Sequence, residues 1–176
     1  TLARLIDEAE LGVADRAAIG STVVEHLTAE SQAGLRAECL VVLTRLDHSE
    51  SASQRDEVLN ALLADDEDVE ALIAGIGAAG RMGAVQAHTR LLECLSHQYP
   101  AVREATVDCL GVLEQDEGFT ALMGMLGDPD PDVVAAVVVR LGRAKGVKQR
   151  MVDELSQRPI KEWQGLLGAL IAQDDE

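Results

Sequence analysis

The sequence repeats itself at an interval of 31 residues, and this period constrains the fold more than any other feature. The segment "PAVREATVDCLGVL", which begins at Pro100, aligns with "PDVVAAVVVRLGRA", which begins at Pro131. Within it, Val102 aligns with Val133 and Leu110 with Leu141. Repeats of this length are typical of stacked supersecondary units, each of which buries its apolar face against its neighbours.

A second pattern indicates what the repeated unit is. A pair of apolar residues followed by Leu recurs at Val23-Val24/Leu27, Val58-Leu59/Leu62, Leu91-Leu92/Leu95, Leu122-Met123/Leu126 and Met151-Val152/Leu155. The spacing i, i+1, i+4 marks one face of an α-helix. We therefore predict an all-α chain of about five helical pairs, at residues 14–46, 54–79, 84–114, 118–144 and 147–172, with an amphipathic capping helix at 2–11.

The acidic run "GDPDPD" admits two interpretations, a calcium loop or a helix start. An EF-hand loop needs Gly at its sixth position and Glu at its twelfth, but counting from Asp128 places Val133 and Val139 there. Asp130 instead suits an N-cap, with Pro131 at the first helical position and Asp132 near the positive end of the helix dipole. The acidic residues are therefore predicted to start a helix.

The valine run that follows favours a strand by propensity alone. In the aligned repeat, however, Arg103, Glu104 and Asp108 stand in place of Val134, Ala135 and Val139. A buried strand would not accept these charges, so we predict that residues 133–139 are helical.

The segment from Pro100 and its relatives resemble HEAT repeats, especially the short bacterial HEAT-like repeats also found in phycobilisome lyases. The resemblance is best over residues 84–146. It implies one armadillo-like domain over residues 1–176, a right-handed α-solenoid (α-α superhelix) with the second helix of each pair on the concave side. The Val-Arg pair of such repeats is present at Val102-Arg103 but absent at Val133-Val134, so a regular ladder of Asp–Arg contacts is not expected.

The formal charge of −16 comes from 31 acidic and 15 basic residues spread along the chain. Nucleic-acid binding needs the opposite sign, so we expect no nucleic-acid partner. A solvated acidic surface explains the charge, with a salt-loving source as the alternative. The spacing of Cys39, Cys94 and Cys109 does not resemble a disulfide framework, and we expect neither a secretory leader nor a membrane-spanning segment. The expected location is the cytoplasm, without a membrane partner.

None of the candidate chemical motifs is complete. A zinc site needs three or four protein ligands, and Cys94 and His97 supply two. Their expected role is structural, with Cys94 and Cys109 in the core. The segment "GIGAAGRMG" at residues 75–83 lacks the strand and the Lys of a phosphate loop, so its glycines are expected at a helix contact and a helix end. We predict a chain that is not an enzyme and holds no metal or cofactor.

The resemblance implies a scaffold that binds another protein on its concave face. In the helix at 131–144, Val133, Val137 and Leu141 are expected to face the core, and Val139 to face away from it. Repeat equivalents and neighbours extend this exposed position to a predicted partner-binding column of Val41, Arg45, Glu70, Ala74, Glu104, Asp108, Val139 and Arg143. The alternatives are an accessory, maturation or lyase-type factor that handles a chromophore or cofactor, or, since the first residue is Thr1, a regulatory domain cut from a larger protein.

Overall fold

The computed structural model describes residues 11–29, 32–46, 52–64, 66–113, 116–144 and 148–155, together with 157, 163, 167, 168 and 171. Over these residues the secondary structure is helical and includes no strand, which confirms the predicted all-α, HEAT-like solenoid class. Chain contacts divide the molecule into two compact units, residues 1–87 and 88–176.

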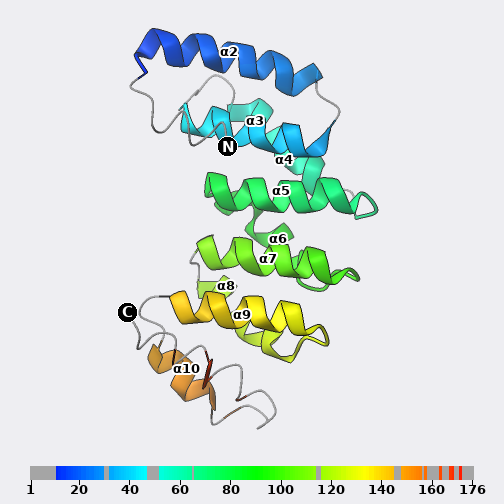
Figure 1. Cartoon of the computed structure of the whole chain (residues 1–176), viewed down its shortest axis with the longest axis vertical. Helices are drawn as coiled ribbons and strands as arrows, with labels where there is room; N and C mark the ends of the chain where they lie inside the picture. The colour runs from blue at the N-terminus through cyan, green and yellow to red at the C-terminus, as the bar shows by residue number, and fades with distance from the viewer. Residues whose placement is uncertain are drawn as a thin grey trace. The chain divides into compact units, whose positions relative to one another are not determined.

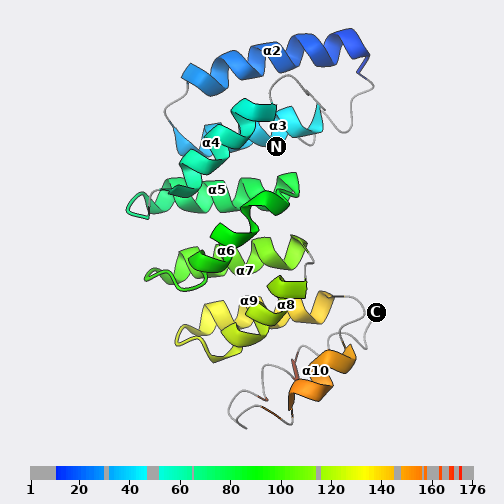
Figure 2. The ribbon, with the colours of Figure 1, turned by 180° about the vertical axis from the view of Figure 1, so that it is seen from behind.

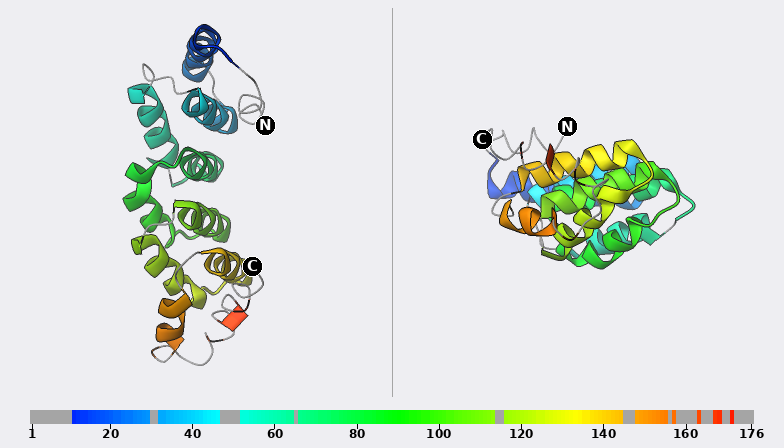
Figure 3. Two further views of the ribbon diagram at one scale, coloured as in Figure 1. Left: turned by 90° about the vertical axis from the view of Figure 1, so that its left-hand side faces the viewer. Right: turned by 90° about the horizontal axis from the view of Figure 1, so that it is seen from below.

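The first unit has two layers of helices. Its elements are α2 (Val13–Ala29), α3 (Ala33–Arg45), α4 (Ala52–Ala64), α5 (Val69–Met82) and the short 3-10 helix η2 (Val85–Ala87). Helices α2, α3 and α5 lie side by side in one layer, and α4 forms the other (Figure 1 and Figure 3). The predicted pair at 14–46 therefore differs from the others, because α2 extends the layer of α3 and does not face it from the opposite layer.

The second unit repeats the two-layer arrangement with more regularity. It contains α6 (His88–Cys94), α7 (Pro100–Leu113), α8 (Asp116–Gly124), the 3-10 helix η3 (Met125–Gly127), α9 (Pro131–Arg143) and α10 (Lys148–Leu155). Helices α7 and α9 form one layer, and α6 and α8 lie in front of them when the molecule is seen from behind (Figure 2). The range 84–114 of one predicted pair contains α6 and α7, and the range 118–144 of the next contains α9 and most of α8.

The start of α9 confirms the role predicted for the acidic run. The Asp130 carboxylate accepts hydrogen bonds from the backbone N–H groups of Asp132 and Val133, at 3.0 and 3.5 Å. The valine run is helical, and Val133 and Val137 are fully buried together with Leu141 one turn later. The repeat thus outweighs β propensity here because the spacing of the buried residues fits a helix.

The glycines of the 75–83 segment have the structural roles that were predicted. A Cβ atom at Gly75 would lie 2.9 Å from the Leu62 Cβ, so a glycine lets α4 and α5 approach closely. Gly83 ends α5 with a φ of 65°, in the left-handed region that glycine adopts without strain.

Some predictions concern residues beyond the described ones. The capping helix at 2–11 falls almost entirely outside them. Of the predicted pair at 147–172, the described part is α10 and a few separate residues after it. The single-domain prediction over 1–176 likewise stays a prediction.

Candidate functional site

A shallow hollow lies on the surface formed by α7 and α9, which run side by side (Figure 1). We call it the α7–α9 hollow, and its volume is about 390 Å³. Its lining is Glu104, Asp108, Asp132, Ala135, Ala136, Val139 and Arg140. The lining therefore combines small apolar side chains from α9 with carboxylates from both helices.

Helix periodicity explains why these residues meet. Glu104 and Asp108 are one turn apart on α7, and Ala135 and Val139 are one turn apart on α9. The opposite side of α9 is fixed in the core by Val133, Val137 and Leu141. As a result Val139 faces outward, with 47% of its surface exposed.

An ion pair crosses the hollow from one helix to the other. The Arg140 Nε donates a hydrogen bond to the Asp108 Oδ1 at 2.8 Å. The aliphatic part of Arg140 lies over Gly111, where a Cβ atom would be only 2.7 Å from the Arg140 Cδ. The glycine thus allows the guanidinium to reach Asp108, and the pair holds the α7 wall against the α9 wall.

A second Arg–Asp contact fixes the start of α9. The Arg103 guanidinium donates two hydrogen bonds of 2.8 Å to the Asp128 carboxylate and one of 2.9 Å to the backbone oxygen of His97. These bonds lower the pKa of Asp128 below its ordinary value. Asp128 also accepts the backbone N–H of Asp130 at 2.9 Å, so this contact orients the helix start that carries Asp132. The contact also argues against the calcium-loop interpretation, because both carboxylate oxygens of Asp128 accept hydrogen bonds from Arg103.

The structure brings together part of the predicted column. Glu104, Asp108 and Val139 line the α7–α9 hollow, and Arg143 is exposed one turn beyond Val139. In the first unit, Arg45 and Glu70 are exposed and Ala74 is half-buried.

The predicted placement of Val41 on an exposed face is corrected by the structure. Val41 is 1% exposed and belongs to a run of four consecutive buried residues, 40–43. Helix α3 packs against α2, α4 and α5, so it is enclosed around more of its circumference than a two-layer repeat implies. Val41 of α3 is therefore buried although the aligned position in α9, Val139, is exposed.

Sequence reasoning missed Arg140, Asp132 and the two alanines of the hollow. A usable signal exists for Arg140, because it follows Asp108 by one repeat and one residue, and residues one repeat apart lie on adjacent helices. The exposed alanines have no such signal, because Ala is common both in helix interiors and on helix surfaces.

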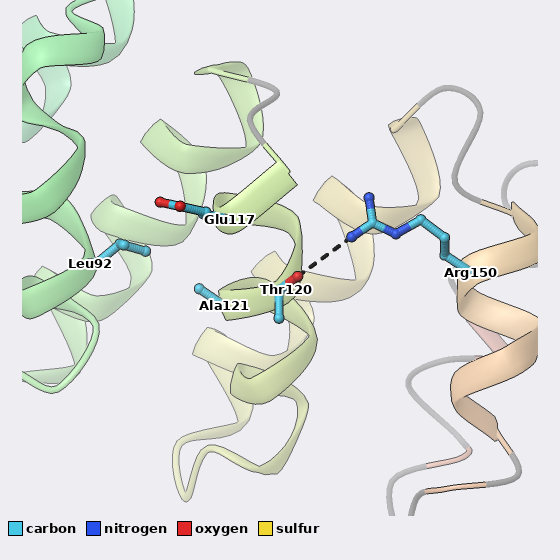
Figure 4. Close-up of a pocket in the computed structure, with 5 residues that line it drawn as sticks. All are labelled: Leu92, Glu117, Thr120, Ala121 and Arg150. Carbon is cyan, nitrogen blue, oxygen red and sulfur yellow. Dashed lines mark hydrogen bonds between the residues drawn. The ribbon is translucent and has the colours of Figure 1, made fainter.

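A larger pocket lies on the other layer of the second unit, with a volume of about 770 Å³ (Figure 4). Leu92 of α6, Glu117, Thr120 and Ala121 of α8, and Arg150 of α10 line it. The Arg150 Nη2 donates to the Thr120 Oγ1 at 3.4 Å, and its guanidinium lies 4.3 Å from the centre of the Phe119 ring. Aromatic and hydroxyl contacts thus hold the Arg150 guanidinium in place.

His88 is buried beside this pocket. Its Nε2 lies 3.6 Å from a Glu117 carboxylate oxygen, and neither ring nitrogen has a hydrogen-bond partner among the described residues. One histidine and one carboxylate supply fewer ligands than a metal site needs. In the described part of the chain, no group of three His, Cys, Asp or Glu residues is arranged to hold a metal ion.

The Cys–His pair singled out in the sequence is not assembled as a site. Cys94 and Cys109 are buried, as predicted, and burial raises the pKa of the Cys109 thiol to about 12. His97 lies in the turn before α7, where its Nδ1 accepts the backbone N–H of Tyr99 at 3.3 Å. A thiol with so high a pKa is not a nucleophile at neutral pH.

Comparison with protein families places residues 88–162 among HEAT repeats. This match covers most of the second unit, including the α7–α9 hollow, and it supports a HEAT-repeat family for the chain. HEAT repeats are commonly protein-interaction scaffolds and are generally non-catalytic. No curated protein matches the sequence. Among the helices described, none is both long enough and apolar enough to span a bilayer.

Proposed function

We propose that this protein is a non-enzymatic scaffold that binds a protein partner on the surface of α7 and α9, the side that the HEAT resemblance makes concave. The observation that carries the proposal is the α7–α9 hollow, in which an exposed Val139 lies beside Glu104 and Asp108. An apolar floor contributes affinity for a docked segment, and charges at its edge fix the register of that segment.

The alignment of the repeats alone extends the proposed binding surface along the predicted column. Arg143 continues it on α9, and Arg45, Glu70 and Ala74 are the corresponding positions in the first unit. Val41 is left out of this extension because it is buried.

The test compares two exposed valines on helices of the second unit. Val139→Glu introduces a charge into the hollow, and Val152→Glu makes the same change on α10, where Val152 is 44% exposed. Each variant and the wild type are immobilised, and proteins captured from the source lysate are quantified. We expect Val139→Glu to lose a partner that Val152→Glu retains. Equal recovery by both variants would exclude the hollow as the binding surface.

The larger pocket favours a second candidate function, an accessory or lyase-type factor that handles a chromophore or cofactor. Its lining combines the guanidinium of Arg150 with the apolar side chains of Leu92 and Ala121, so Arg150 would engage an acidic group of a ligand that lies over this apolar floor. The resemblance of the sequence to the HEAT-like repeats of phycobilisome lyases also motivates this role.

The probe for this second function is anilinonaphthalene sulfonate, an aromatic anion that fluoresces in apolar sites. The control residue is Arg90 of α6, which pairs with Glu93 at 3.2 Å. Binding that disappears in Arg150→Ala but persists in Arg90→Ala would favour the small-molecule role. A wild-type protein that leaves the fluorescence unchanged would remove it.

A further inference from the structure

The charges around the α7–α9 hollow are unbalanced. Among the described residues, its lining contains the three carboxylates of Glu104, Asp108 and Asp132 but a single guanidinium, that of Arg140. Arg140 is already engaged by Asp108 at 2.8 Å. Within the described residues, no cation of the chain forms an ion pair with Glu104 or Asp132. The hollow therefore presents a net negative potential next to an apolar floor.

Local geometry keeps this imbalance in place. The Arg140 stem is confined over Gly111, so its guanidinium is directed to Asp108 and is not available to the other two carboxylates. Asp132 is held at the first turn of α9 by the capped start of that helix. Among the described residues, both carboxylates are therefore exposed to solvent and open to a cation from another molecule.

We propose that the occupant of the hollow is a cationic segment of another protein, which presents a Lys or Arg next to a small aliphatic side chain. This proposal rests on the proposed scaffold function and specifies its partner class. The cation pairs with Glu104 and Asp132, and the aliphatic side chain covers Ala135, Ala136 and Val139.

Charge complementarity selects this occupant over others. An acidic or polyanionic segment would meet like charges both in the hollow and across a chain of formal charge −16. A purely apolar segment would cover Val139 but would remove water from the carboxylates without replacing its hydrogen bonds, which is unfavourable. A second copy of this chain carries the same negative charge and is disfavoured for the same reason.

The probe is a blocked synthetic peptide of 13 residues built of Ala, Lys and Val, titrated into the isotopically labelled full chain and followed by NMR. Two matched peptides replace every Lys by Glu, or every Val by Ser. We expect the Lys–Val peptide to shift resonances of α7 and α9, the Ser version to bind more weakly, and the Glu version not to bind.

Protein variants separate specific docking from diffuse attraction. Glu104→Gln removes one carboxylate from the hollow, and Glu57→Gln makes the same change at an exposed position of α4. We expect Glu104→Gln to weaken binding about fivefold and Glu57→Gln by less than about twofold, because only a docked charge contributes a directed ion pair.

Equal effects of the two variants, or equal binding of the Glu peptide, would overturn the proposed partner class. If that occurs while the lysate partner still depends on Val139, the scaffold function stands and only the cationic nature of its partner falls. If the Val139→Glu variant also retains every partner, the scaffold function falls with it.

Discussion

At the scale of single residues, the Arg103–Asp128 contact makes a defined contribution to stability. Both side chains are largely buried, with 11% and 4% of their surfaces exposed. Because Arg103 holds the folded-state pKa of Asp128 below its unfolded value, folding is favoured when the carboxylate is ionised. This contribution is complete above the unfolded pKa of about 4 and is lost as the pH falls through the lowered folded pKa.

The variant Asp128→Asn tests this contribution. It should lower the free energy of unfolding by about 2 kcal/mol at neutral pH, because it removes hydrogen bonds between charged groups. Urea unfolding at a series of pH values should show the difference from wild type shrinking below about pH 4. Asp56→Asn is the control, since Asp56 is exposed and accepts one hydrogen bond, from Gln86. A difference that persists unchanged to the lowest pH would contradict the assigned ion pair.

Gly111 carries a packing role that a sequence comparison cannot reveal. Ala in a helix is favoured over Gly by about 1 kcal/mol, so Gly111→Ala in α7 would stabilise an unconstrained helix. A Cβ there meets three carbons of the Arg140 side chain at 2.7–3.0 Å, and we expect the substitution to destabilise by about 1 kcal/mol instead.

Gly34→Ala in α3 is the matched control, because a Cβ at Gly34 meets nothing within 4 Å. Thermal unfolding should show Gly34→Ala raising the melting temperature and Gly111→Ala lowering it. In an Arg140→Ala background, Gly111→Ala should become stabilising. If it stays destabilising there, Arg140 is not the constraint.

At the scale of elements, α9 shows how well the repeat alignment predicts which side of a helix is buried. This assignment of buried and exposed sides, the helical phase, correctly places Val133, Val137 and Leu141 in the core and Val139 on the surface. Leu141→Ala should therefore cost about 2–5 kcal/mol in urea unfolding, whereas Val139→Glu should change stability by no more than about 0.5 kcal/mol. Comparable losses from the two variants would place Val139 in the core and reverse the phase.

The same phase fails in α3 for a physical reason. Hydrophobic periodicity shows which side of a helix carries apolar residues, but it carries no information on how many neighbouring helices pack around that helix. α3 has α2 beside it in the same layer as well as α4 and α5, and Val41 is consequently buried. The periodicity of one helix likewise carries no information on the pairing of Asp108 with Arg140, which lies on a different helix.

At the scale of the whole molecule, the interval between repeats predicts the all-helical class that the described residues show. Helix caps and core positions can be predicted from residue type and spacing, as for the N-cap Asp130 and the buried Leu141. The site follows only in part, because ion pairs such as Arg140–Asp108 depend on the distance between helices, which sequence spacing does not contain. Of the predicted column, Glu104, Asp108 and Val139 come together in one hollow.

The most direct test of the central claim asks which surface touches a partner. A photo-crosslinking amino acid is placed at position 139 or at position 152 of the full chain, and each protein is irradiated in source lysate. We predict a discrete covalent adduct with a protein partner from position 139 and none from position 152. Adducts of equal yield from both positions, or an adduct from position 152 alone, would contradict a partner-binding surface on α7 and α9.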